Sequence, residues 1–246
     1  MTGVVIVTGA AQGLGFATVE SLVLAGYSVI GLDLLPPVEP WTLQDTHPQP
    51  VWHLCDVTDE AAIAQVVAPL SDVVGLVNCA GIASYANPVE MSEEHWDRVF
   101  AVDLKSCWLV AKHVIPHMVK KGQGSIVNVS SIHARLTVPG MFPYAAAKSG
   151  VIGLTRSLAL DLAPEGIRVN AVSPGWTRTR LVDEYFQKQT DPDEALRHVL
   201  SVLPLGRMAE PREIADVITF LISESSTAIT GAEINVDVGL GARFAT

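Results

Sequence analysis

A tyrosine and a lysine stand four residues apart in the segment Tyr144-Ala-Ala-Ala-Lys148. On a helix, positions i and i+4 share one face, so these two side chains can meet. An ammonium group beside a phenol favours the phenolate and should lower the phenol pKa, which would suit it to general acid/base chemistry. Ser131 lies shortly upstream, after an apolar run that ends at Val129. A single Tyr-x-x-x-Lys pair is common, and the alternative is an exposed aromatic residue beside a solvated lysine.

The second candidate feature is the glycine-rich segment Thr8–Gly15, with the sequence Thr-Gly-Ala-Ala-Gln-Gly-Leu-Gly. Glycines let the backbone turn tightly and approach a phosphate, and the start of the next helix offers amide N–H groups to it. The Gly-x-x-x-Gly-x-Gly spacing differs from the common Gly-x-Gly-x-x-Gly fingerprint, and alone it could be a structural turn. Its place between an apolar run and a helix favours dinucleotide binding.

Asp33 ends the second apolar run, about 20 residues beyond the glycine motif, where an acidic residue can accept hydrogen bonds from the adenosine ribose. Its charge would repel a 2′-phosphate, by up to about 4 kcal/mol at ~4 Å and an effective dielectric of ~20 before screening. No Arg or Lys occurs in 9–15 or 33–46 to offset this charge. We therefore predict NAD rather than NADP; the alternative is that Asp33 only caps a loop.

Short apolar runs alternate with helical segments, and this order must position the motifs. The expected strands are 4–7, 28–32, 51–54, 73–77, 125–129, 167–172 and 233–236, and the expected helices are 16–25, 60–70, 92–121, 144–163 and 211–222. Strands that are apolar throughout are typical of parallel sheets covered on both faces. We predict one α/β domain over residues 1–246: a single doubly wound parallel β-sheet with helices on both faces, Rossmann-like.

Two segments depart from this alternation. Five prolines between Asp33 and Val51 disfavour a full helix, so we expect a loop or a single turn in place of a crossover helix. Residues 177–206 are irregular, with Asp191 as the expected cap of a short helix. We expect this second segment to be a substrate lid.

Composition excludes several classes of partner. The net charge of −10 and the lack of any basic run oppose binding to nucleic acid or to an anionic membrane. Cys55, Cys79 and Cys107 form neither a disulfide framework nor a zinc-binding pattern, so we expect no metal. No apolar stretch reaches the ~20 residues of a membrane span, and the N-terminus lacks a secretory signal, so we expect a cytoplasmic protein.

Several segments, in this order on one βα chain, resemble the short-chain dehydrogenase/reductase family: Thr8–Gly15, Asn78–Gly81, Ser131, Tyr144 with Lys148, and Ser173–Gly175. The resemblance extends from Val4 to Asp237. It implies an oxidoreductase that moves a hydride between a nicotinamide cofactor and a secondary alcohol or ketone. It also implies that Tyr144 is the general acid/base, that Lys148 holds the nicotinamide ribose, and that Ser131 hydrogen-bonds the substrate oxygen.

The resemblance further implies the cofactor contacts. Asp56 and Val57 would contact the adenine, and the segment Asn78–Gly81 would line the adenine and ribose side. Pro174 and Gly175 would meet the carboxamide. With the residues discussed above, the expected cofactor-binding set is Gly9, Gln12, Gly13, Leu14, Gly15, Asp33, Asp56, Val57, Asn78, Ala80, Gly81, Tyr144, Lys148, Pro174, Gly175, Thr177 and Thr179.

Two positions depart from the family pattern. Asp103 stands where family members usually carry an asparagine that anchors a proton relay through water. Aspartate lacks the amide donor and can carry a charge, so either its backbone carbonyl serves the relay or the change is simply tolerated; we keep Asp103 as a catalytic candidate. The segment Val236–Gly239 replaces a more usual Asp-Gly-Gly, which could alter subunit contacts.

The sequence says less about the substrate. Candidate pocket residues beside the matched motifs are Ser131, His133, Met141, Trp176, Arg180 and Tyr185. His133 could bond a substrate or face solvent, and for Arg180 a surface salt bridge is the plainer role. The shortened crossover and the lid favour a small substrate, and we predict oxidation of a polar cyclic alcohol or a sugar-like polyol.

Three further questions stay open. One alternative is a 3-oxoacyl thioester reductase, against which Asp33 and the lack of a basic patch argue mildly. A noncatalytic nucleotide-binding regulator is a remote alternative, because Ser131, Tyr144 and Lys148 are all present. The resemblance also implies a homo-oligomer, with a tetramer favoured over a dimer and helices 94–119 and 144–163 as its faces.

Overall fold

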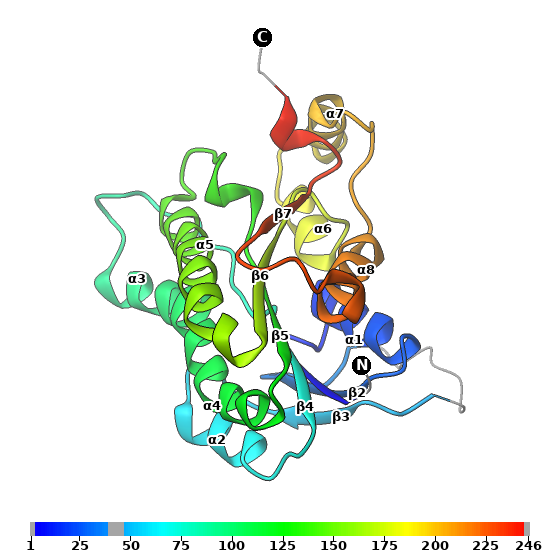
Figure 1. The fold of residues 1–246 in the computed structure, drawn as a ribbon. Coiled ribbons are helices and arrows are strands. Elements are labelled where there is room, and N and C mark those ends of the chain that lie inside the picture. Colours follow the sequence, from blue (N-terminus) through cyan, green and yellow to red (C-terminus); the bar gives the residue numbers. More distant parts are fainter. Residues whose placement is uncertain (1–2, 39–46, 244–246) are drawn as a thin grey trace.

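A parallel β-sheet forms the centre of the computed structural model, which describes residues 3–38 and 47–243 (Figure 1). Its seven strands lie in the order β3-β2-β1-β4-β5-β6-β7. Their bounds are β1 Val4–Thr8, β2 Ser28–Asp33, β3 Val51–Leu54, β4 Val73–Asn78, β5 Gly124–Val129, β6 Ile167–Pro174 and β7 Glu233–Val236. The strand order runs outward in one direction from β1 and in the other from β4. A topological switch point therefore lies between these two strands.

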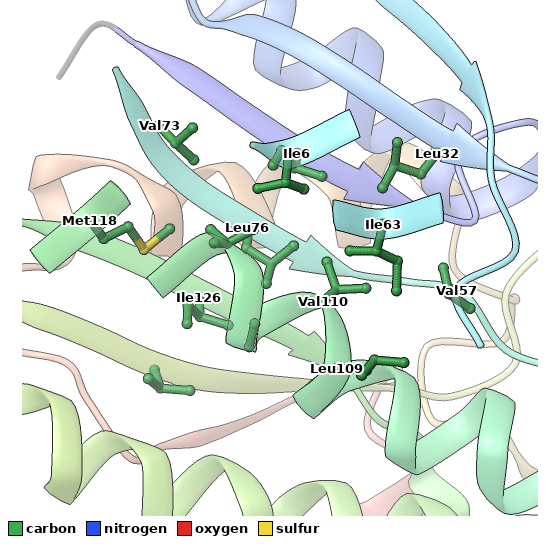
Figure 2. Close-up of a cluster of buried hydrophobic side chains, with 14 of the residues drawn as sticks. Ile6, Leu32, Val57, Ile63, Val73, Leu76, Leu109, Val110, Met118 and Ile126 are labelled. Carbon is green, nitrogen blue, oxygen red and sulfur yellow. The ribbon is translucent and has the colours of Figure 1, made fainter. Parts of the chain in front are cut away.

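Helices cover both faces of the sheet, which confirms the predicted doubly wound fold. The helices are α1 Gly13–Leu24, α2 Glu60–Val67, α3 Glu93–Phe100, α4 Ser106–Lys121, α5 Phe142–Leu162, α6 Arg180–Gln187, α7 Pro192–Val202 and α8 Pro211–Ile222. Ile6 and Leu76 of the sheet pack with Ile63 of α2 and Val110 of α4 on one face (Figure 2). Val5 and Val7 point to the opposite face, toward α1 and α8. Side chains alternate between faces along each strand, so both faces are apolar.

Most predicted boundaries hold within a few residues, and the differences have local causes. Helix α1 begins at Gly13 rather than Phe16, because the glycines of the motif form its first turn. Helix α5 begins at Phe142, with Pro143 in its first turn, where proline loses no hydrogen bond. Asp191 caps α7 as predicted: its Oδ1 accepts a hydrogen bond from the Glu194 N–H at 2.9 Å.

The two irregular segments, residues 177–206 and the connection between β2 and β3, have different outcomes. Helix α6 was not predicted; the Thr179 side chain caps it by accepting from the Val182 N–H at 3.4 Å. Between β2 and β3, residues 34–38 and 47–50 form no helix, as expected, while 39–46 lie outside the described residues. Within the part of the chain that the structure describes, no helix has the length and apolar character of a membrane span.

The predicted helical stretch 92–121 is interrupted by a π-helical turn. Residues Ala101–Lys105 form this turn between α3 and α4. A π-helical turn changes the direction in which the side chains of a helix point, and such turns are frequent at functional sites. Here the turn contains Asp103, whose side chain is fully buried.

Candidate active site

The candidate residues gather where the strands end at the switch point. The glycine motif follows β1, Asn78–Gly81 follows β4, Ser131 follows β5, and Pro174 ends β6. In parallel sheets these carboxyl ends share one edge, so segments far apart in sequence line one site. The sheet thus brings the predicted motifs to one edge of the molecule.

The glycine loop is held against the segment after β4 at distances that only glycine permits. Gly9 has φ +65°, and a Cβ there would lie 2.7 Å from the Ala80 Cα. A Cβ on Gly15 would lie 2.1 Å from the Gly9 carbonyl oxygen. The Thr8 hydroxyl oxygen accepts hydrogen bonds from the N–H groups of Cys79 at 3.0 Å and Ala80 at 3.1 Å. The loop therefore has a fixed shape beside the start of α1.

The start of α1 fits a phosphate group. Gln12 precedes the helix but its side chain makes no cap hydrogen bond, and its Oε1 is buried without a partner. The first turn of α1 holds no acidic residue. Gly13 has φ +55°, and a Cβ there would lie 3.6 Å from the Thr179 side chain, while Leu14 packs partly buried on the core. A helix N-terminus with open N–H groups and a glycine cradle suit the pyrophosphate of a dinucleotide.

Asp33 lies beside this cradle. Its Oδ2 accepts a hydrogen bond from the Ala11 N–H at 2.9 Å, and its Oδ1 accepts from the Leu35 N–H at 3.2 Å. Each carboxylate oxygen can accept more than one hydrogen bond, so both retain acceptor capacity. Asp33 thus joins the end of β2 to the glycine loop, and its carboxyl group lies beside the cradle.

Of the two residues expected around the adenine, Asp56 is held by hydrogen bonds and Val57 is part of the core. Asp56 Oδ1 accepts hydrogen bonds from the N–H of Thr58 at 2.8 Å and from its hydroxyl at 2.7 Å. Burial raises the pKa of the Asp56 carboxyl, but these hydrogen bonds and nearby Arg98 outweigh burial and lower it. Val57 is buried in the core, so only its backbone can face a ligand.

Asn78 is also buried and ties neighbouring elements together. Its Nδ2 donates to the Asn128 Oδ1 at 2.8 Å and to the Cys107 carbonyl at 3.2 Å. Its Oδ1 is buried without a partner. Asn128, which the sequence analysis did not single out, also donates to the Thr155 hydroxyl at 2.9 Å. These bonds hold Asn78 against β5 and α4, and tie β5 in turn to α5.

Tyr144 and Lys148 share one face of α5, as their spacing predicts. The Lys148 Nζ lies 5.6 Å from the centroid of the Tyr144 ring, and the Lys148 residue is only 3% exposed. Lys148 donates to the Val129 carbonyl at 3.2 Å, and its own carbonyl accepts from the Ser130 hydroxyl at 2.9 Å. The end of β5, which carries Ser131, is thereby fixed to the helix that carries Tyr144.

Asp103 belongs to the same buried cluster. Its Oδ1 lies 3.7 Å from the Lys148 Nζ and accepts a hydrogen bond from the Ile82 N–H at 2.8 Å. Its Oδ2 is buried with no hydrogen-bond partner. A Cβ on Gly81 would lie 2.8 Å from Oδ1, so glycine is needed for this approach. The π-helical turn directs the Asp103 side chain toward Lys148.

Burial and charge act in opposite directions on this pair. Burial raises the pKa of the Asp103 carboxyl, and the Lys148 charge and the Ile82 N–H only partly offset this effect. Burial lowers the pKa of the Lys148 ammonium, but the neighbouring Tyr144 phenol and then the Asp103 carboxyl outweigh burial and raise it. Lys148 therefore remains charged next to the phenol.

The predicted pocket residues divide into two groups. His133 lies edge-on to the Tyr144 ring at 5.9 Å, and burial lowers the pKa of its imidazole. The backbone N–H of His133 donates to the Ser131 hydroxyl at 3.2 Å. Met141 is buried just before α5. Arg180 instead is exposed and lies 3.3 Å from Glu184 on the same helix, the surface salt bridge that the sequence left as an alternative.

An aromatic group lies on the side of α6. The rings of Trp176 and Tyr185 are 5.5 Å apart, and Tyr185 stacks on Tyr85 at 6.4 Å. Tyr85 was missed in the sequence, although its place in the loop after β4, at the carboxyl edge of the sheet, could have indicated it.

The segment after β6 is tightly packed. A Cβ on Gly175 would lie 2.8 Å from the Asp237 Cβ, and the buried Thr177 donates its hydroxyl to the Gly175 carbonyl at 3.2 Å. The backbone that follows β6, from Pro174 to Thr177, is therefore held in place beside β7. The described residues hold no group of three or more His, Cys, Asp or Glu side chains placed to bind a metal ion.

A doubly wound sheet with a glycine loop at its switch point and a tyrosine beside a buried lysine defines a class of dinucleotide-dependent oxidoreductases. A family model described as enoyl-(acyl carrier protein) reductase matches residues 9–241. A 3-oxoacyl-[acyl-carrier-protein] reductase from Thermotoga maritima is 40% identical over 96% of this chain and 97% of its own. The chain belongs to the short-chain dehydrogenase/reductase family, which confirms the resemblance and the assignment as an oxidoreductase.

Other similar proteins are named for ring compounds, sugars or sugar acids. A cis-4-hydroxycyclohexanecarboxylate dehydrogenase from Sinomonas cyclohexanicum is 38% identical over 96% of this chain and 95% of its own. The solved structure of a Thermoplasma acidophilum aldohexose dehydrogenase has a TM-score of 0.92 at 34% identity and covers 100% of this chain and 96% of its own. A structure named as a 2-deoxy-D-gluconate 3-dehydrogenase from Agrobacterium tumefaciens, with bound NADP, has a TM-score of 0.87 at 33% identity and covers 98% and 97%.

Proposed function

We propose that the protein oxidises a secondary alcohol carbon of a small polar cyclic alcohol or sugar-like polyol, with NAD as cofactor. One observation carries this proposal: the Tyr144 phenol lies beside the buried Lys148 ammonium at the carboxyl edge of the sheet, next to a glycine cradle. NAD, when bound, supplies the acceptor for the hydride of the carbinol carbon. Tyr144 takes the proton of the substrate hydroxyl, and Ser131 donates a hydrogen bond to the same oxygen.

The other residues of the site hold this arrangement. Lys148 keeps a positive charge beside the phenol and stabilises its deprotonated form. Asp103 holds the ammonium from the other side at 3.7 Å. Gln12 and the glycines of the loop would hold the pyrophosphate of the bound cofactor, and the backbone of Pro174–Thr177, with Thr179 close by, would meet its carboxamide.

The choice of NAD rests on Asp33. Its carboxylate lies beside the glycine loop at the end of β2, and no Arg or Lys occurs in 33–46 to bind a 2′-phosphate. One related structure is named with bound NADP, so the cofactor of this protein has to be measured directly. The ratio of kcat/KM for NAD over NADP is the test.

The substrate class is supported by the names of two relatives, an aldohexose dehydrogenase and a hydroxycyclohexanecarboxylate dehydrogenase. We further propose that residues 177–206 act as the substrate lid, because α6 and α7 pack around Phe186, Val199 and Leu203 in a cluster apart from the two main cores. A second candidate function is reduction of a 3-oxoacyl thioester, which the name of the 40% identical Thermotoga relative favours.

We also propose a cytoplasmic homo-oligomer, with a tetramer favoured. Trp108 on α4 and Leu160 on α5 are exposed apolar side chains on the helices expected to form subunit faces. The free cysteines fit a reducing compartment. Light scattering of the purified protein measures the oligomeric state, and a monomer would contradict this part.

The test is a panel of cyclic alcohols, aldoses, open-chain polyols and a 3-oxoacyl thioester, followed by absorbance at 340 nm with NAD(H) and NADP(H). We expect the highest kcat/KM for a cyclic alcohol or an aldose with NAD. Tyr144→Phe should abolish turnover and leave NADH binding, measured by fluorescence, unchanged. Full activity of Tyr144→Phe would overturn the mechanism, and activity on the thioester alone would select the second candidate.

A further inference from the structure

Tyr85 and Tyr185 make a ring contact between two segments 100 residues apart in sequence. Tyr85 lies in the loop after β4, and Tyr185 lies on α6. Their ring centroids are 6.4 Å apart and the ring planes differ by only 16°, which is a stacked arrangement. The loop that carries Tyr85 and the proposed lid are thereby joined at the carboxyl edge of the sheet.

Tyr85 is carried by a loop that is fixed on both sides. The N–H of Ala86 donates to the Gly140 carbonyl at 2.9 Å, and a Cβ on Gly140 would lie 3.6 Å from the Tyr85 ring. The preceding Ser84 is buried, and its hydroxyl lies within hydrogen-bond distance, 3.1 Å, of the His95 Nε2. Tyr85 therefore packs against the segment just before α5, at Gly140, four residues from Tyr144.

Tyr185 belongs to the opposite, separately packed unit. Its ring contacts those of Trp176 at 5.5 Å and Phe186 at 5.4 Å, and Phe186 packs with Val199 and Leu203 of the α6–α7 cluster. None of these rings belongs to the two main cores. The stack on Tyr85 thus connects the α6–α7 unit to the wall that carries the catalytic phenol.

The pair lies close to the reacting groups. Burial raises the pKa of the Tyr85 phenol, and the nearby phenols of Tyr185 and then Tyr144 add to this increase. The geometry agrees with this: Tyr85 packs beside Gly140, which lies four residues before Tyr144 in the chain. Tyr185 contacts Trp176, which follows β6 at the same edge of the sheet. A substrate whose hydroxyl bonds Tyr144 would therefore lie near the Tyr85–Tyr185 stack.

We propose that Tyr85 and Tyr185 form an aromatic clasp that selects substrates of about one ring in size and excludes extended acyl thioesters. The proposal rests on the proposed function and names how the site would choose among its candidate substrates. Ring faces offer flat apolar surface to the C–H face of a cyclic alcohol or a pyranose. An extended chain attached to the reacting carbon has to leave the site between the two walls, and the closed stack obstructs that route.

The test compares Tyr85→Ala and Tyr185→Ala with Tyr85→Phe, which keeps the ring and removes only the hydroxyl. Val89→Ala is the matched control, because Val89 follows in the same loop and is 91% exposed. We measure kcat/KM for a cyclic alcohol and for a 3-oxoacyl thioester. Each alanine variant should shift the ratio toward the thioester by roughly two- to tenfold or more, the range expected for losing one aromatic pair. Tyr85→Phe and Val89→Ala should leave the ratio unchanged.

A second measurement follows the contact between Tyr85 and the α6–α7 unit and needs no substrate. Lys188 and Arg197 are cleavage sites for trypsin on the α6–α7 unit. Tyr85→Ala should speed cleavage there, because it frees this unit from the opposite wall, whereas Tyr85→Phe should not. Unchanged NADH binding confirms that each variant is folded.

The outcomes separate the clasp from the proposed function. If the wild-type protein turns over only the thioester, the proposed function and the clasp as a barrier are both overturned. If the wild-type protein oxidises cyclic alcohols but Tyr85→Ala changes neither the ratio nor the cleavage rate more than Val89→Ala does, the clasp is overturned while the proposed function remains.

Discussion

The carboxylate of Asp103 lies 3.7 Å from the ammonium of Lys148, and both side chains are buried. A π-helical turn at Ala101–Lys105 produces this contact by pointing Asp103 toward α5. A buried ion pair of this kind adds little net stability, but removing one partner leaves the other charge uncompensated. Asp103 is therefore one of the groups that influence the charge of Lys148 beside Tyr144.

Replacing this carboxylate should change the pH dependence of activity. Burial lowers the pKa of Lys148, but neighbouring groups, led by the Tyr144 phenol and then the Asp103 carboxylate, raise it above its ordinary value. Asp103→Asn removes one of them, so the pKa of Lys148 should fall. Since the proposed mechanism needs the charged ammonium, the alkaline limb of the kcat/KM profile should move to lower pH.

The matched control is Asp97→Asn, which removes the same charge from an exposed position on α3. It should leave the profile where it is. Coincident pH profiles for Asp103→Asn and the wild-type protein would show that the carboxylate has no electrostatic role.

The second prediction concerns cofactor choice. Asp33→Asn removes the charge but can still accept the hydrogen bond from the Ala11 N–H that holds the glycine loop. Without the repulsion of a 2′-phosphate, the ratio of kcat/KM for NAD over NADP should fall by at least about tenfold. Asp33→Ala should lower the ratio too, and should also weaken NADH binding because the loop loses a contact. A wild-type preference for NADP would contradict the assignment.

The third prediction tests the close packing of the glycine loop. A Cβ on Gly15 would lie 2.1 Å from the Gly9 carbonyl oxygen, so Gly15→Ala must displace the backbone of the loop. We expect a loss of roughly 2 kcal/mol or more in the free energy of unfolding and much weaker NADH binding. Gly153 on α5 has no atom within 4 Å of its added Cβ, and Gly153→Ala should be neutral or stabilise by up to about 1 kcal/mol. Thermal or urea unfolding measures both, and equal stability of the two variants would count against the packing argument.

The fourth prediction concerns strain near the C-terminus. Val238 has φ +52°, a left-handed conformation that costs a β-branched residue of the order of 1–2 kcal/mol. Its side chain also packs against apolar clusters, so Val238→Gly alone mixes relief of strain with loss of packing. Val238→Ala loses similar packing but keeps the strain. The glycine variant should therefore exceed the alanine variant by about 1 kcal/mol in free energy of unfolding, and the reverse order would refute the strain.

The sequence alone determined the order of strands and helices, the glycine loop, and the Tyr144–Lys148 pair. These features depend on local patterns: apolar periodicity, glycine spacing, and the i, i+4 geometry of a helix, which are read over a few neighbouring residues. Their positions at the carboxyl ends of successive strands then followed from the handedness and order of a doubly wound sheet. The resemblance to the family further marked Asp103 as an aspartate at a position where an asparagine is usual.

Only the tertiary structure decided what surrounds these residues. A helical pattern over 92–121 does not reveal a π-helical turn, so the burial of Asp103 against Lys148 could not be read from it. The Tyr85–Tyr185 stack joins residues 100 positions apart. The sequence left two roles open for Arg180, and the structure places it in a surface ion pair with Glu184. Such contacts depend on how whole elements pack in space, because side-chain burial and pairing are set by neighbours that the chain brings together only when it folds.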